Sequence, residues 1–83
     1  MAMGSYYFFT QEWNESDILP HGRCTAKVTE YGFKTEKEIN EIVYCMERYS
    51  PYDYVDHYKD KNEEAYRRQI ETLRDNGAEI VES

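Results

Sequence analysis

The feature that most constrains the fold is a helix signal in the middle of the chain. Thr35 and Glu38 have the spacing of a capping box, in which the threonine accepts a first-turn N–H and the glutamate reaches back to the threonine N–H. Apolar residues then recur with the spacing of one helical stripe: Ile39, Ile42, Val43 and Met46. The pattern predicts an amphipathic helix that ends near Tyr49 and buries this stripe against another element.

A second helix signal lies near the C-terminus. Asp60 or Asn62 can cap this helix, and Asn76-Gly77 ends it, because glycine readily adopts the left-handed conformation that follows a helix. Its apolar stripe consists of Tyr66, Ile70 and Leu73. The segment AEIVE, residues 78–82, then predicts a short strand that joins the edge of a sheet.

Two further strands are predicted in the N-terminal half. The segment SYYFFTQEW (5–13) is rich in aromatic β-formers on both of its faces, so we expect both faces to be covered. The segment RCTAKVTEYGF (23–33) alternates, with Cys24, Ala26 and Val28 on its inward face. A loop over residues 14–22 separates them, which predicts an antiparallel hairpin.

The stretch YSPYDYVDHYKD (49–60) holds four of the nine tyrosines. Ser50 is a good N-cap and Pro51 is tolerated at the first helical position, so the sequence predicts a short helix over residues 51–59. The chain is then a small two-layer α+β domain of order β-β-α-α-α-β, with an antiparallel sheet and the helices on one face. Residues 6–83 form this single domain, and residues 1–5 (MAMGS) are typical of a cloning remnant.

Metal ligands and catalytic groups are sparse. The histidines and cysteines are His21, Cys24, Cys45 and His57. Four such ligands could fill a tetrahedral zinc shell, and His21 and Cys24 have a ligand-like spacing, but the chain has no paired C-x-x-C motif. We therefore expect no metal and no cofactor. Two cysteines also indicate a reducing, cytoplasmic setting rather than a disulfide scaffold.

Asp53 and His57 would lie at i and i+4 on the predicted short helix, where a carboxylate can orient an imidazole. No nucleophile accompanies this pair, and the chain contains no G-x-S-x-G, Walker A or G-x-G-x-x-G motif. We interpret the pair as an exposed helical contact, and we expect the protein to be non-enzymatic.

The charge balance restricts the class of partner. The chain has 17 acidic and 10 basic side chains, a net charge of −7, and residues 1–22 contain no Lys or Arg. This charge disfavours direct binding to nucleic acids or to anionic membranes, and no stretch is apolar enough to span a bilayer. A basic protein, such as a nucleic-acid-binding protein, is the expected partner.

Tyrosines interleaved with carboxylates suit a protein–protein hot spot that faces Arg and Lys side chains. The alternative is that several of these tyrosines only seal the layer between helices and sheet. The candidate partner-binding residues are Tyr49, Tyr52, Asp53, Tyr54, Asp56, Tyr58, Asp60 and Glu63.

Two functions follow from this surface. The leading hypothesis is an interaction module that occupies the basic site of a nucleic-acid-binding protein, in the manner of phage-encoded anti-restriction or anti-CRISPR inhibitors. The alternative is a small-ligand or nucleotide binder, in which tyrosines stack on the ligand and Lys59, Arg67 or Arg68 meets its phosphates. That alternative favours an oligomer, because one chain is too small to enclose a ligand; the sequence leaves the oligomeric state open.

Overall fold

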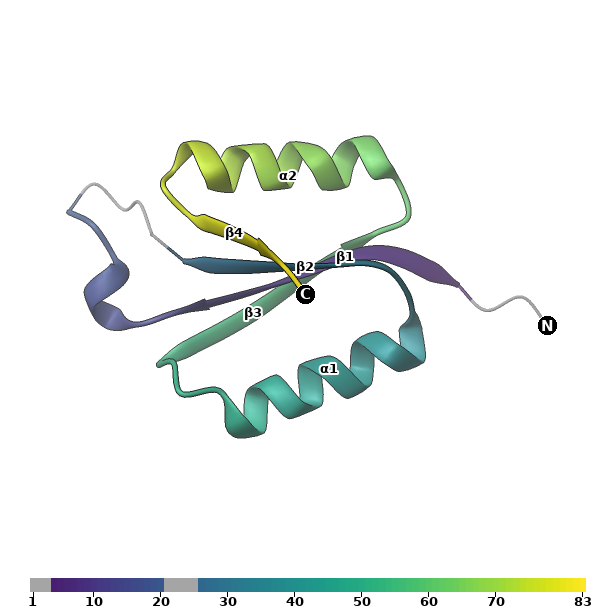
Figure 1. Ribbon diagram of the computed structural model, residues 1–83, viewed down its shortest axis with the longest axis horizontal. Coiled ribbons are helices and arrows are strands. Elements are labelled where there is room, and N and C mark those ends of the chain that lie inside the picture. The colour runs from purple at the N-terminus through teal and green to yellow at the C-terminus, as the bar shows by residue number, and fades with distance from the viewer. Residues whose placement is uncertain (1–3, 21–25) are drawn as a thin grey trace.

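A four-stranded sheet with an α-helix on each face forms the described part of the chain, residues 4–20 and 26–83 of a computed structural model (Figure 1). The elements are β1 (Ser5–Trp13), the short 3-10 helix η1 (Glu15–Asp17), β2 (Lys27–Thr35), α1 (Glu36–Tyr49), β3 (Tyr54–Asp60), α2 (Glu63–Asp75) and β4 (Glu79–Glu82). The class is α+β, as expected, but the order of elements differs from the prediction.

The strands lie in the order β3-β1-β2-β4. β1 is antiparallel to both β2 and β3, and β4 is parallel to β2. The predicted hairpin and the final edge strand are therefore confirmed. The predicted antiparallel sheet is wrong, because the crossover through α2 makes β4 parallel to β2 and the sheet is mixed.

The predicted start of α1 and the predicted start and end of α2 are confirmed as well. The Thr35 N–H donates to Glu38 at 2.9 Å and the Glu38 N–H donates to the Thr35 hydroxyl at 3.2 Å, which is the capping box of α1. Asn62 caps α2 by accepting the Ala65 N–H at 3.1 Å. Gly77, with φ of 99°, follows the end of α2 in a conformation that favours glycine.

The predicted helix over residues 51–59 is wrong, because Tyr54–Asp60 forms strand β3. Proline disfavours helical geometry in the residue before it, so Pro51 ends α1 rather than starting a new helix. Ser50 accordingly has φ −62° and ψ 134° and is the C-cap of α1. The segment that follows alternates with period two and is rich in aromatic and β-branched residues, which favours a strand.

The prediction that the helices share one face is also wrong. α1 connects β2 to β3, and α2 connects β3 to β4. These crossovers join parallel strands and run in opposite directions across the sheet. Because nearly all such crossovers are right-handed, opposite directions place the two helices on opposite faces, as Figure 1 shows.

The core is divided between the two faces, and both faces of β1 are buried as predicted. On the α2 side, Phe9 and Val28 pack with residues of the C-terminal helix and its following turn: Tyr66, Ile70 and Ala78. On the α1 side, Phe8, Thr10 and Ile39 are buried. The rest of the α1 stripe, Ile42, Val43 and Met46, is partly exposed, so this side of the core is thinner.

Candidate functional site

The end of β1 and the start of β3 meet at one corner of the sheet. Trp13 pairs with Tyr54 across the strands, and their rings stack with centroids 5.7 Å apart. Neither of the segments that build this corner, residues 4–20 and 49–58, contains a Lys or Arg. The acidic corner, as we name it, spans this end of the sheet on both faces. Trp13, Tyr54 and Asp56 lie on the face of α2, Glu12 lies on the face of α1 with Tyr49, and Glu15, Tyr52 and Asp53 lie in the adjoining segments.

Reciprocal hydrogen bonds fix the acidic corner. The Glu15 N–H donates to the Asp53 carboxylate at 3.0 Å, and the Asp53 N–H donates to the Asn14 side-chain oxygen at 3.0 Å. The Tyr54 hydroxyl donates to the Glu15 carboxylate. These bonds join η1 to the start of β3, so the corner is ordered before any partner binds.

A second set of hydrogen bonds links the end of α1 to β1. The Ser50 hydroxyl donates to Oε2 of Glu12 at 2.6 Å, and the same hydroxyl accepts the Tyr52 N–H at 3.2 Å. The Ser50 N–H also closes the last turn of α1 through the Met46 carbonyl. Ser50 therefore orients the Glu12 carboxylate instead of capping a helix start.

The corner carries uncompensated negative charge. The four carboxylates, of Glu12, Glu15, Asp53 and Asp56, each accept a hydrogen bond but form no ion pair with the described residues. The hydrogen bond to Glu15 and the charge of that carboxylate raise the pKa of Tyr54, which keeps the phenol neutral. The corner thus presents carboxylates beside neutral aromatic rings, a combination suited to cationic side chains.

The structure separates the predicted partner-binding residues into two groups. Tyr49, Tyr52, Asp53, Tyr54 and Asp56 lie in the acidic corner, where Tyr49 is 73% exposed and Tyr54 is 43% exposed. The other group lies along or beyond β3 and consists of Tyr58, Asp60 and Glu63.

The second group has structural partners. Tyr58 stacks on Phe9 at 5.4 Å and donates its hydroxyl to Asp60 at 2.7 Å, so it belongs to the core on the α2 side. Glu63 pairs with Arg67 at 2.9 Å. Asp60 is six residues beyond Tyr54, or about 20 Å along a strand. The alternative that some tyrosines only seal the core thus holds for Tyr58, and not for Tyr49 or Tyr54.

Three members of the corner were missed in the sequence: Glu12, Trp13 and Glu15. They lie some 40 residues before Tyr54 in the chain, and the register of β1 with β3 brings them beside it. The signal that could have pointed to them was the lack of Lys and Arg in residues 1–22. That signal did not show which other segment lies beside them.

The proposed pairing of Asp53 with His57 is not formed as predicted. Residues four apart in an extended chain are about 13 Å apart, so the helical i, i+4 contact does not exist. Asp53 is bonded within the corner, while the His57 N–H donates to its neighbour Asp56 at 2.8 Å.

The weak metal candidates are not brought together either. Cys45 is exposed on α1 and His57 is exposed on β3, whereas His21 and Cys24 lie outside the described residues. Among residues 4–20 and 26–83, no group of three or more His, Cys, Asp or Glu is placed to hold a metal ion. In the same part of the chain, no helix is long and apolar enough to cross a membrane.

The basic residues predicted to meet a phosphate lie outside the corner, although another arginine, Arg48, lies over the Tyr49 ring at 5.8 Å. Lys59 lies over the Tyr6 ring at 4.9 Å and is 4.0 Å from Glu36, and Arg67 is bonded to Glu63. The structure therefore does not gather the exposed tyrosines and the predicted phosphate contacts into one site.

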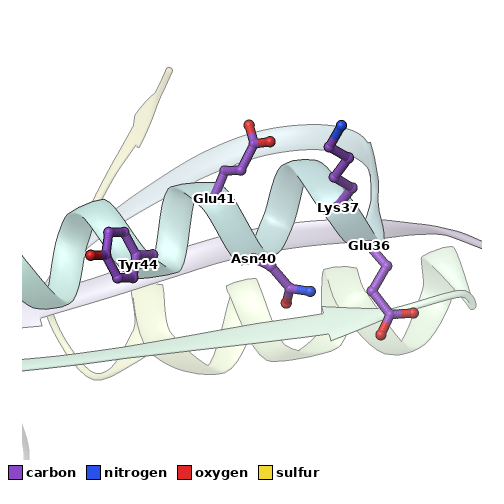
Figure 2. A pocket seen from close by; sticks show the side chains of 5 residues that line it. All are labelled: Glu36, Lys37, Asn40, Glu41 and Tyr44. Atoms are coloured by element: carbon purple, nitrogen blue, oxygen red, sulfur yellow. The ribbon is translucent and has the colours of Figure 1, made fainter.

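A shallow hollow lies on the outer side of α1 (Figure 2). The five residues that line it all come from this one helix: Glu36, Lys37, Asn40, Glu41 and Tyr44. Figure 2 shows Lys37 and Glu41 on one side of the helix and Glu36 and Asn40 on the other. Side chains that diverge from a single helix cannot enclose a ligand, so this hollow is not a binding site.

Comparisons with known proteins add no family assignment. The chain matches no family model, no curated protein and no solved structure. The proposal of a function therefore depends on the fold and on the acidic corner.

Proposed function

We propose that this protein is a non-enzymatic interaction module whose acidic corner occupies the basic, nucleic-acid-binding site of another protein. The observation that carries the proposal is the set of four carboxylates that form no ion pair within residues 4–20 and 26–83, near the exposed rings of Tyr49 and Tyr54. Carboxylates that no internal cation occupies are free to meet the Arg and Lys side chains of a partner.

The geometry of the corner supports protein binding in a second way. Its carboxylates and rings are held by hydrogen bonds between η1, the end of α1 and β3. Because these groups are already ordered, binding costs little additional side-chain entropy. Aromatic rings and arginines are the side chains that most often dominate interface energy, so Tyr49 and Tyr54 are the expected anchors.

The mechanism is steric competition assisted by charge. Carboxylates placed where phosphates would bind block access of a nucleic acid to the partner, and the net charge of −7 steers the encounter. A small acidic inhibitor of the anti-restriction or anti-CRISPR kind would act in this way. Binding should then weaken as salt rises, because ions screen exposed charges within about 8–10 Å at physiological strength.

The test uses two double variants, each of which removes two negative charges. Glu15→Gln with Asp56→Asn removes two of the four negative charges of the corner but keeps an oxygen to accept the bonds from Tyr54 and from the His57 N–H. Glu64→Gln with Glu71→Gln neutralises two exposed positions of α2 and is the matched control. The protein captured by the wild type from a host lysate is identified by mass spectrometry, and its Kd is measured for each variant.

We expect the corner variant to bind about tenfold or more weakly, and the control to change by less than about twofold. We also expect nucleic acid to compete with the wild type for the captured protein. Equal affinities for the two variants, or a Kd that does not change between about 50 and 500 mM salt, would contradict the proposal.

A further inference from the structure

A groove of about 540 Å³ lies between the C-terminal half of α1 and the sheet. It exists because the apolar stripe of α1 is only partly buried beyond Ile39. Ile42 and Met46 form an apolar wall, and Tyr31 and Tyr49 supply aromatic rings. The groove continues into the acidic corner, with which it shares Glu12 and Tyr49.

The charge of the groove limits what can bind there. Among the described residues, the charged ones that line it are Glu12 and Glu41, and none of them is a lysine or arginine. Glu12 is half-buried, and its Oε2 accepts the Ser50 hydroxyl at 2.6 Å, which leaves Oε1 for a ligand. An entirely apolar occupant would remove this carboxylate from water without a cation, which is costly.

We propose that this groove receives an arginine side chain of the basic partner. The inference rests on the proposed function and specifies the residue that the partner inserts. The guanidinium pairs with Glu12 and stacks on a tyrosine ring, while the aliphatic stem contacts Ile42 and Met46. Arginine fits better than lysine, because its planar group stacks on aromatic faces, binds carboxylates through two N–H groups and is more weakly hydrated.

Other occupants fit these observations less well. A second copy of the chain would bring another net charge of −7 against the same acidic surface. A volume of about 540 Å³ exceeds one side chain and matches sites that take a short segment. We therefore expect the arginine to enter together with part of its own backbone.

The experiment titrates labelled hexa-arginine and hexalysine peptides into the folded protein and measures Kd by fluorescence anisotropy. Cys45→Trp fills the groove without changing the net charge, and Cys45→Ser is its control at the same exposed position. Glu12→Gln removes the negative charge but keeps an oxygen for Ser50. Far-UV circular dichroism checks that each variant retains the wild-type fold.

We expect Cys45→Trp and Glu12→Gln each to weaken hexa-arginine binding about tenfold, and Cys45→Ser to leave it unchanged. Hexa-arginine should bind several-fold tighter than hexalysine and should shift the amide resonances of Tyr31 and Met46. Equal Kd values for the two peptides would overturn the assignment to arginine, whatever the variants do.

The inference can fail while the proposed function stands. Suppose that the Glu15→Gln, Asp56→Asn variant weakens hexa-arginine binding and that Glu12→Gln does not. The peptide would then contact the part of the corner outside the groove, and the assignment of the arginine to the groove would be wrong. Failure of hexa-arginine to bind the wild type at millimolar concentration would also overturn it. The proposed function is tested by separate measurements, which are the response of the captured partner to the corner variant and to salt. Glu12→Gln keeps the test decisive if Cys45→Trp does not fold.

Discussion

The hydroxyl of Tyr66 offers the sharpest test of how the two layers are held together. Tyr66 is 3% exposed, and its hydroxyl donates to the Glu30 carboxylate at 2.9 Å, which ties α2 to β2. Tyr66→Phe removes this donor but keeps the ring contacts with Phe9 and Tyr7, at 5.6 and 5.7 Å. The substitution therefore removes the bond to Glu30 together with the longer bond, of 3.5 Å, that the same hydroxyl donates to the Phe8 carbonyl.

A hydrogen bond to a charged acceptor contributes about 1.5–3 kcal/mol to stability. Glu30 is half-buried, so water can replace part of the lost bond, and the lower end of this range applies. A domain of this size has a total stability of about 4–12 kcal/mol. A loss of about 1.5 kcal/mol, with a urea m-value of about 1 kcal/mol/M, lowers the unfolding midpoint by about 1.5 M.

The pH dependence gives an independent check of the same bond. Burial, and then the hydrogen bond to Glu30, raise the pKa of Tyr66 well above the usual value of 10.0. The stabilisation is therefore complete below pH 10 and is lost as pH rises above it, because the unfolded chain then releases a proton that the folded chain retains. The two proteins share every other ionisable group, so the contributions of those groups cancel in the comparison with Tyr66→Phe.

The assay is urea unfolding of both proteins, followed by Trp13 fluorescence and far-UV circular dichroism, from about pH 7 to pH 11. The difference in free energy of unfolding should be constant up to about pH 9 and should shrink above pH 10. A midpoint shift below about 0.3 M, or a difference that grows with pH, would refute the role given to the Tyr66 hydroxyl.

Two further substitutions test local features of the fold. Ser50→Ala removes the bond to Glu12 and should cost about 1–2 kcal/mol in urea unfolding; a change under about 0.3 kcal/mol would contradict its part in orienting Glu12. Gly32→Ala should cost about 1–2 kcal/mol from backbone strain alone, because φ is +79° and a Cβ would meet no atom within 4 Å. Gly32→Asn should cost less, since asparagine tolerates this region better, and the reverse order would refute the explanation.

Local signals predicted most of the secondary structure. The capping box of Thr35 and Glu38, the Asn62 cap and the Asn76-Gly77 stop act within a few residues, so the sequence alone placed both helices. The alternation of Ala26 and Val28 likewise placed β2, and both are buried. In these segments the pattern and the propensities favour the same element.

The prediction for residues 49–60 was wrong because two sequence signals conflict there. Ser50-Pro51 has the form of a helix start, yet the same dipeptide ends α1, since proline restricts the residue before it. The alternation after Pro51 was therefore read with the wrong period. Because of that one error, the predicted fold lacked a strand of the sheet and had its helices on one face. It also did not bring Tyr54 beside Trp13 and Glu15.

The corner itself depends on contacts between residues far apart in the chain. The register of β1 with β3 places Trp13 opposite Tyr54, and no local pattern in either segment specifies this register. The sequence identified the acidic and aromatic character of residues 49–56 correctly. Tyr54 and Tyr58 lie on the same face of β3, so their exposure is decided by their position along the strand: Tyr58 lies opposite Phe9 in the core, whereas Tyr54 lies opposite Trp13 at the end of the pairing.

Proline substitutions along β3 test the corrected assignment directly. Among the described strands, β3 lies at the edge of the sheet and pairs with β1 alone. The His57 N–H donates to the Asp56 carboxylate, so it is directed away from β1, and alternation then directs the Asp56 N–H toward β1. Proline at 57 removes no bond between strands, whereas proline at 56 does.

We expect His57→Pro to cost about 1 kcal/mol and Asp56→Pro to cost about 3 kcal/mol in urea unfolding, each measured against alanine at the same position. A helix over residues 51–59 would give both prolines a penalty of about 3 kcal/mol or more, because each would break an interior turn. Equal losses of unfolding free energy at the two positions would therefore support the predicted helix over residues 51–59 and not strand β3. That outcome would also contradict the pairing of Trp13 with Tyr54, on which the acidic corner depends.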